Sequence, residues 1–261
     1  MRLLPLGTNG FLPGHGRQTM SFLVERAGAL VLLDAGSGVS RLLEPAARAL
    51  LDDAERLDVV LTHYHLDHLV GLSYLPGVAR GLALRIFAPA PPLTESGPEA
   101  LAALIAPPFF PVTLERWPMP VEVRPYSGPE LEAGPFRVAV RSQDHPGGSA
   151  GLRLGDELAY ITDTVCDPAT ARFVRGVGTL LHEVWLTDEE SAREAAARTG
   201  HSAAGEVADL ARRARVRRLL PVHHHPRRSG EELVALAAEL RRRSELEVEL
   251  AIEGMPLELG R

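Results

Sequence analysis

The chain has 261 residues, 45% of them hydrophobic, which is enough for one domain with a substantial apolar core. We therefore expect residues 1–261 to form a single domain. The formal net charge of -6 disfavours a general nucleic-acid-binding protein, and the single cysteine, Cys166, excludes an internal disulfide. No apolar run approaches the roughly 20 residues of a membrane-spanning helix, and no basic segment followed by an apolar one opens the chain. We expect a cytoplasmic protein that is not bound to a membrane.

All 28 basic residues are arginine, and Asn9, Gln18 and Gln143 are the only side-chain amides. Few heat-labile amides are typical of a protein from a thermophile. The absence of lysine instead favours a codon bias, because hyperthermophile proteins are enriched in lysine and glutamate. Neither interpretation bears on function.

Short apolar runs at the start of the chain predict strands. They cover residues 2–6, 20–26 and 29–34, with a Gly-containing turn between the last two. A helix follows, with Ser40 as its predicted N-cap, because apolar residues then recur at helical spacing. A β-branched apolar run at 57–62 predicts a buried strand.

Residues 78–125 are rich in proline, so we expect irregular connections there, interrupted by a strand near 84–88 and a short helix at 98–105. The second half restarts the pattern. Its predicted strands are 136–144, 152–154, 157–162, 180–186 and 216–222, and its predicted helices are 203–214 and 231–243. Ser229 and Glu232 form a predicted capping box for the last helix. Alternating strands and helices in each half predict an α/β sandwich, with sheets covered by helices.

The stretch 61–71, LTHYHLDHLVG, places His63, His65, Asp67 and His68 directly beyond a predicted strand. The carboxyl edge of an open α/β sheet commonly binds ligands. Side chains two apart in a turn can chelate one ion, and a second pair at a helix start can face another. Four metal-type side chains within six residues favour a metal site over four unrelated structural roles.

Residues 63–68 read HYHLDH, which resembles the HxHxDH signature of the metallo-β-lactamase superfamily. The resemblance extends along almost the whole chain. LLDAG at 32–36 is similar to the early aspartate turn of that family, and DHP at 144–146, ITD at 161–163 and VH at 222–223 match its later ligand motifs in order. The resemblance implies a four-layer αββα sandwich of two similar halves.

The resemblance also implies the metal ligands. One ion would be held by His63, His65 and His145, a second by Asp67, His68 and His223, and Asp163 would bridge the two. The cofactors would be two divalent metal ions, with zinc favoured and manganese or iron as alternatives.

Two such ions can share a water and lower its pKa towards neutrality, which gives a metal-bound hydroxide as the nucleophile. Asp67 would then be catalytic as well as a ligand, because it would orient that hydroxide. Asp34 has two interpretations: it fixes the tautomer of a ligand imidazole, or it only organises its own turn.

The last ligand lies among three consecutive histidines. Strand alternation sends His223 and His225 to one side and His224 to the other. We choose His223 because its distance to Pro226 resembles the HxxP ending of relatives, which leaves the other two for solvent or substrate. Cys166 follows the bridging position and is predicted to be a small buried apolar residue.

Two further motifs bear on the substrate. HE at 182–183 and GHS at 200–202 resemble paired motifs of ribonuclease Z and related cyclic-phosphate phosphodiesterases. By that resemblance Glu183 would orient His201, which would protonate the leaving oxygen or stabilise the phosphorane charge. The first motif reads HEVW where relatives have HEAT, and no long Gly-rich insertion is present, so transfer-RNA processing is not favoured. In the alternative, Ser202 caps a helix, Glu183 pairs with an arginine and His201 is a surface residue.

We therefore predict a dinuclear metal-dependent hydrolase that acts on phosphodiesters such as a small nucleotide, a cyclic phosphate or an RNA-type substrate. One alternative is a thioester, lactone or β-lactam hydrolase of the same fold. Another is a non-hydrolytic metal-binding or nucleotide-binding protein. The expected partner is a small molecule or short nucleotide, and a homodimer is an open alternative.

Two groups of residues are weaker candidates for the site. Arginines near the predicted active edge could hold a phosphate or carboxylate: Arg17, Arg153 and Arg227. Apolar residues of the Pro-rich segment could line the mouth of the site, a dimer contact or the core: Phe109, Phe110 and Trp117.

Overall fold

The computed structural model describes residues 1–193 and 200–260, which contain two seven-stranded sheets. The strand order is β14-β1-β2-β3-β4-β5-β6 in the first sheet and β13-β12-β11-β10-β9-β8-β7 in the second. In each sheet antiparallel pairs on one side give way to parallel pairs on the other. The two halves therefore follow one plan.

The first sheet consists of β1 (Arg2–Gly7), β2 (Ser21–Arg26), β3 (Ala29–Leu33), β4 (Arg56–Val60), β5 (Ala83–Pro89), β6 (Val121–Tyr126) and β14 (Leu257–Glu258). The second consists of β7 (Glu130–Ala133), β8 (Phe136–Gln143), β9 (Ser149–Leu154), β10 (Leu158–Ile161), β11 (Thr179–Glu183), β12 (Arg218–Val222) and β13 (Glu247–Val248). The helices of the first half are η1 (Ser37–Leu43), α1 (Pro45–Leu51), α2 (Leu66–Leu69), η2 (Val70–Tyr74), α3 (Leu75–Val78), α4 (Glu99–Leu104) and η3 (Leu114–Arg116). Those of the second are α5 (Thr170–Phe173), α6 (Asp188–Arg193), α7 (Ala204–Ala214) and α8 (Gly230–Ser244).

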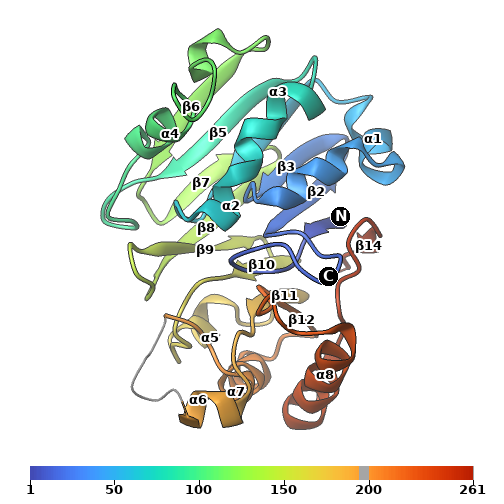
Figure 1. The fold of residues 1–261 in the computed structure, drawn as a ribbon. Helices are drawn as coiled ribbons and strands as arrows, with labels where there is room; N and C mark the ends of the chain where they lie inside the picture. The colour runs from blue at the N-terminus through green and yellow to red at the C-terminus, as the bar shows by residue number, and fades with distance from the viewer. Residues whose placement is uncertain (194–199, 261) are drawn as a thin grey trace.

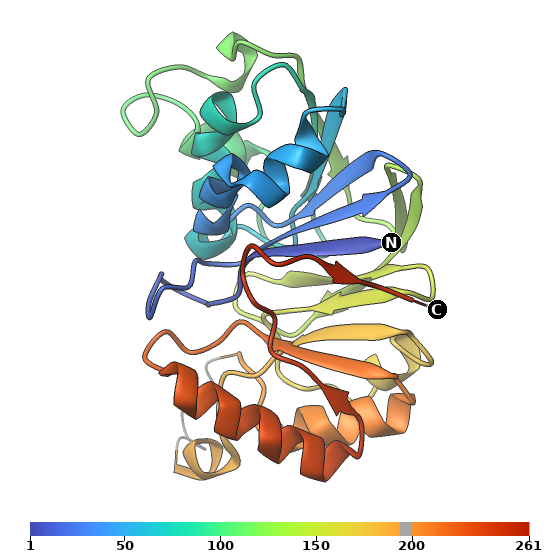
Figure 2. The ribbon, with the colours of Figure 1, turned by 90° about the vertical axis from the view of Figure 1, so that its right-hand side faces the viewer.

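The sheets pack face to face and the helices lie on their outer faces (Figure 1 and Figure 2). Three apolar clusters separate the layers. One lies between the first sheet and its helices, one between the two sheets, and one between the second sheet and α7 and α8. In the middle cluster, Phe22 of β2 meets Tyr160 of β10 edge to face, with ring centroids 5.6 Å apart. The predicted αββα sandwich of two similar halves is thus confirmed.

The predicted N-cap of the first helix is wrong. Residues 37–43 form the 3-10 helix η1, and α1 begins only at Pro45, with Glu44 as its N-cap. Proline lacks a backbone N–H and has a fixed φ, so it is favoured in the first helical turn, where no intrahelical partner is available. Ser40 instead donates its hydroxyl to the carbonyl of Ser37.

The Pro-rich segment is more regular than expected, because it ends in β6, which pairs with β5 in parallel. Pro125 is tolerated there because β6 is an edge strand and needs no second partner. The predicted strand 180–186 ends early, at Glu183. Beyond it, the N–H groups of Trp185 and Leu186 bond to the carbonyl of Ser202.

The predicted capping box of α8 is present. Ser229 accepts a hydrogen bond from the N–H of Glu232 (3.2 Å), and Glu232 accepts one from the N–H of Ser229 (2.7 Å). None of the helices within the described ranges combines the length and apolar character needed to cross a bilayer.

The contact between the sheets gives a first testable prediction. Phe22 is completely buried between them, so Phe22→Ala should lower the free energy of unfolding by about 3–5 kcal/mol, through lost burial and the cavity left behind. Urea denaturation followed by circular dichroism measures this. Phe109, which is 79% exposed, is the matched control, and Phe109→Ala should stay within about 0.5 kcal/mol. Equal losses in both variants would contradict the placement of Phe22.

Candidate metal centre

The HYHLDH segment lies directly beyond the carboxyl end of β4. His65 is the N-cap residue of α2, which places Asp67 and His68 in the first helical turn, as the sequence predicted. His63 and His68 are buried, whereas His65 is exposed to the cavity. The short strand and the helix start thus turn four side chains towards one place.

Three other strand ends complete the cluster. His145 follows β8, Asp163 follows β10 and His223 follows β12. Asp163 and His223 take left-handed backbone conformations, with φ of 50° and 51°, and so does Asp34 after β3, with φ of 55°. Non-glycine residues rarely adopt this region, and such strain is concentrated at functional sites.

The side chains form two groups in which the candidate ligand atoms lie within 4.8 Å of one another. The first contains His63, His65, His145 and Asp163, and the second contains Asp67, His68 and His223. Asp163 lies between the groups. Its Oδ1 is 3.6 Å from His145 Nε2 and 3.2 Å from His223 Nε2, and its Oδ2 is 3.1 Å from His68 Nε2. The structure thus brings together the residues that the sequence predicted as two ligand sets and a bridge, and their role as metal ligands stays a prediction.

Hydrogen bonds at Nδ1 fix how three of the imidazoles face the cluster. His68 Nδ1 donates to Asp34 (2.8 Å) and His145 Nδ1 donates to the Gly200 carbonyl (3.0 Å), because both partners can only accept. The Thr62 hydroxyl donates to Asp34, so its oxygen accepts from His63 Nδ1 at 3.0 Å. In the neutral form of each ring the proton therefore lies on Nδ1, and Nε2 is the nitrogen that faces the cluster.

The residues present fit divalent metal ions. His63 Nε2 and His68 Nε2 are buried and have no hydrogen-bond partner among the described residues, which is costly unless an ion occupies the site. Imidazole nitrogen and carboxylate oxygen are donors suited to zinc, manganese and iron. Asp34 acts as the orienting partner that one interpretation of the sequence predicted, and it also bonds to Thr62 and to Tyr160.

Burial and neighbouring charges shift the pKa values of several side chains in the cluster. Burial lowers the pKa of His63 well below its ordinary value, and burial lowers the pKa of His145 to about 4. For His68, burial is outweighed by Asp163, Asp67 and Asp34, which raise its pKa well above the ordinary value. For Asp163, burial is outweighed by the surrounding histidines, His223 foremost, and its pKa falls well below the ordinary value. The carboxylate is therefore held ionised, which the predicted bridging role requires.

The three consecutive histidines separate as predicted, but strand alternation is not the cause, because β12 ends at Val222 and His223 takes a left-handed backbone. His223 enters the cluster, with its Nε2 3.3 Å from Asp67 Oδ2. His225 packs edge to face on Trp185, with centroids 4.6 Å apart. His224 is buried elsewhere, and its backbone pairs with the loop after β1 through the Thr8 carbonyl.

The second predicted pair is also in contact. His201 Nδ1 lies 2.8 Å from Glu183 Oε2, and Glu183 is completely buried at the end of β11. Trp185 stacks on the His201 ring, with ring centroids 4.6 Å apart and an angle of 20° between the ring planes. Ser202 caps no helix, because its hydroxyl donates to the Thr164 carbonyl. The alternative in which His201 is an isolated surface residue is therefore wrong.

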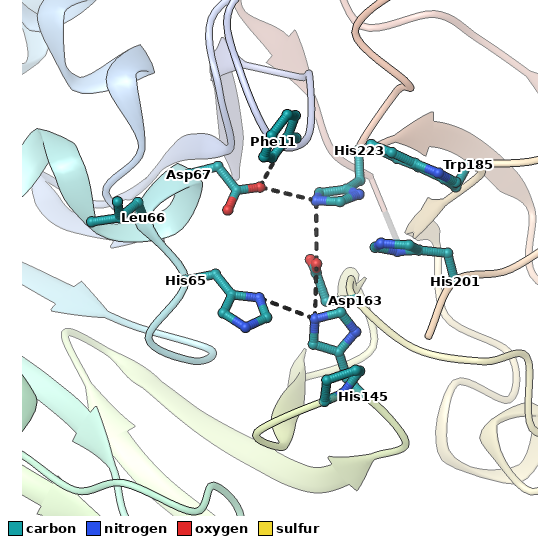
Figure 3. A pocket seen from close by; sticks show the side chains of 10 residues that line it. Phe11, His65, Leu66, Asp67, His145, Asp163, Trp185, His201 and His223 are labelled. Atoms are coloured by element: carbon teal, nitrogen blue, oxygen red, sulfur yellow. Dashed lines mark hydrogen bonds and ion pairs between the residues drawn. The ribbon is translucent and has the colours of Figure 1, made fainter. Parts of the chain in front are cut away.

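A cavity of about 500 Å³ opens beside the cluster (Figure 3). Its described lining is Phe11, His65, Leu66, Asp67, His145, Pro146, Asp163, Trp185, His201 and His223. Sequence reasoning missed Phe11, Leu66, Pro146 and Trp185 as cavity-lining residues. Leu66, Pro146 and Trp185 directly neighbour motif residues, which is a usable signal, but nothing in the sequence marks Phe11.

The weaker candidates lie elsewhere. Arg17 bonds to Asn9 and to the Arg228 carbonyl, and Arg153 bonds to the carbonyls of Phe173, at the end of α5, and of Arg175 beyond it. Arg227 and Phe109 do not line the cavity. Trp117 is 6% exposed in the outer core of the first sheet, and Phe110 packs beside it. Cys166 packs against the outer core of the second sheet, and burial raises its pKa to about 12.

A four-layer αββα sandwich with two His/Asp groups at one edge defines the metallo-β-lactamase class of folds. The model of the family described as "Beta-lactamase superfamily domain" matches residues 30–224, so the chain belongs to this superfamily. Ribonuclease Z of Bradyrhizobium sp. (strain ORS 278) is 27% identical, over 91% of this chain and 94% of the relative. The metallo-beta-lactamase fold protein YhfI from Bacillus subtilis has 20% identity and a TM-score of 0.77, covering 99% of each chain. A diphosphatase from the PhnP family has 19% identity and a TM-score of 0.70, covering 98% of this chain and 97% of its own.

The orienting role of Asp34 gives a second prediction. Asp34→Ala should weaken zinc binding by about 10-fold to 100-fold, because His68 loses the acceptor that fixes its tautomer. Competition with a chromogenic chelator measures the affinity. Asp58 is the matched control: it is equally buried but bonds to Arg56, Arg85 and the Gly134 N–H, away from the cluster. If Asp58→Ala weakens zinc binding as much, the effect is general loss of structure.

Proposed function

We propose that this protein is a dinuclear metal-dependent hydrolase of phosphodiesters, with zinc as its metal. The contact between Glu183 and His201 at the cavity wall, beside both ligand groups, carries the proposal. A histidine held by a buried carboxylate can deliver a proton to a leaving oxygen, which cleavage of a phosphodiester requires. The relatives named ribonuclease Z support the same reaction class.

The residues divide the chemistry among them. Two divalent ions in the ligand sets would activate a water and offset the negative charge that develops on the phosphoryl oxygens. Asp67 accepts a hydrogen bond from the Phe11 N–H at 2.7 Å, which fixes the orientation of its carboxylate at the cavity. Glu183 holds Nδ1 of His201, so Nε2 remains for the substrate, and Trp185 stacked on the ring fixes its plane. His201 is the group we assign to the leaving oxygen.

The size of the cavity supports a small substrate. About 500 Å³ lies within the range of small-molecule sites, which is roughly 300–1,000 Å³. A short nucleotide or a cyclic phosphate fits this volume, whereas a folded RNA would need contacts well beyond it. We therefore propose a small or short diester as the substrate.

The test of this function is a third prediction. Zinc-loaded protein should hydrolyse bis-p-nitrophenyl phosphate, and removal of the metal with a chelator should abolish turnover. His201→Ala should lower kcat by about 100-fold or more while zinc content is unchanged, because general acid catalysis contributes about that much. The release of p-nitrophenolate and elemental analysis measure the two quantities. His15→Ala, which changes an exposed histidine, is the control.

Other outcomes of that test point elsewhere. Turnover of nitrocefin, a thioester or a lactone without turnover of the diester, and with His201 dispensable, would indicate the other hydrolase classes of this fold. Loss of one zinc in His201→Ala would make His201 a ligand, since its ring also lies within ligand distance of Asp163 and His223.

A fourth prediction separates Glu183 from His201. Glu183→Gln should lower kcat by about tenfold or more, because the His201 ring loses its anchoring carboxylate. Combined with His201→Ala, it should add less than about a twofold loss, because two residues that act through one group are not additive. Steady-state kinetics on the two single variants and the double variant measure this. Losses that multiply would show that Glu183 acts independently, through its contact with the Thr164 N–H or with His223.

A further inference from the structure

The cavity has a polar floor and apolar walls. Its apolar lining consists of Phe11, Leu66, Pro146 and Trp185. No lysine or arginine is among the described residues that line it. A substrate with several phosphates would need such cations in the wall, since each extra charge must be paired. The wall is therefore suited to an uncharged part of the substrate.

Two of these apolar side chains are largely exposed to solvent, which is unfavourable for large apolar groups. Phe11 is 71% exposed and Leu66 is 64% exposed, and both stand at the cavity beside Asp67 (Figure 3). Large apolar side chains gathered at the mouth of a cavity are typical of a binding surface, because a ligand removes them from water. We call Phe11 and Leu66 the apolar rim.

The backbone of Phe11 takes a left-handed conformation that places its side chain at the cavity. Its φ is 62°, in the left-handed region that a phenylalanine rarely adopts. The N–H of Phe11 donates to Asp67 Oδ2, which compensates for the strain. Gly10 lies against the His223 ring, where an added Cβ would come within 2.3 Å of Cε1. The absence of a side chain at Gly10 allows the loop to reach over the metal ligands and present Phe11.

The loop that carries Phe11 is also held at both ends. Glu253, near the C-terminus, accepts from the N–H of Thr8 (2.9 Å) and from the N–H of Gln18 (3.0 Å). Between these ends, Arg17 bonds to Asn9 at 2.7 Å. A loop fixed in this way loses little entropy when a ligand binds, so the rim is preorganised.

We propose that the apolar rim binds an aromatic ring of the substrate. The substrate class is then a small diester with an aromatic group, such as a nucleobase or a phenyl ring, on one side of the phosphorus. This inference rests on the proposed function, and it adds that Phe11 and Leu66 determine specificity through their side chains.

The test compares two ligands that differ only in the group offered to the rim. Phenylphosphonate and methylphosphonate carry the same phosphonate, so calorimetry on zinc-loaded protein isolates the ring. Wild type should bind phenylphosphonate about tenfold more tightly, as burial of a phenyl ring predicts. Phe11→Ala and Leu66→Ala should each reduce that ratio by about threefold or more. Phe109→Ala, an equally exposed phenylalanine outside the cavity lining, should keep it.

Two results would overturn the proposal: no preference for the phenyl ligand in wild type, or an unchanged ratio in both rim variants. An unchanged ratio with both ligands weakened would mean that the variants disturb Asp67 and the candidate metal ligands instead of removing a ring contact. Calorimetry reads binding alone. Failure of wild type to hydrolyse bis-p-nitrophenyl phosphate would therefore refute the proposed function without deciding the role of the rim.

Discussion

One buried carboxylate orients two imidazoles of the centre and joins the two sheets. Asp34 is completely buried, and it accepts hydrogen bonds from the Thr62 N–H and hydroxyl, from His68 Nδ1 and from the Tyr160 hydroxyl. Tyr160 belongs to the second sheet, so the same residue joins the two halves of the sandwich. A carboxylate in the core is costly unless each lone pair is occupied. The partners that satisfy it are those that aim His63 and His68, so the stability of Asp34 and the geometry of the metal ligands depend on the same bonds.

The rest of the centre follows from this arrangement. The strands end at one edge, and the residue next to or just beyond three of those ends, Asp34, Asp163 and His223, takes a left-handed backbone. That turn places each side chain at the seam between the sheets, where all three are almost completely buried and charges act strongly on each other. Packing of the core between the two sheets holds the strand ends in place. This packing offsets the cost of the three left-handed backbone conformations and of the close approach of several histidines.

Much of this could be predicted because it is local in sequence. The HYHLDH segment and the strand before it place four candidate ligands within six residues. The separation of His223 from His224 was also predicted, although its cause is the left-handed backbone of His223 beyond the end of β12. The predicted N-cap Ser40 was wrong because α1 begins at Pro45, a residue favoured in the first helical turn. Strand β6 was not predicted because it contains Pro125, which an edge strand tolerates. Phe11 could not be found, since its place depends on Gly10 against His223 and on Glu253, more than 200 residues away in the chain.

The candidate ligands and the cavity walls are held in place by different parts of the fold. The candidate ligands lie at or just beyond strand ends that the core fixes, and most of them are buried among charged groups. The walls come from the loop after β1 and from Trp185 beyond β11, which contact the cluster through backbone and ring faces. Substitutions in the walls alter what the cavity admits while the bonds of Asp34 stay intact. A fold with one metal centre can therefore serve several substrate classes, and under our proposal the apolar wall, more than the candidate ligands, distinguishes the substrate of this chain.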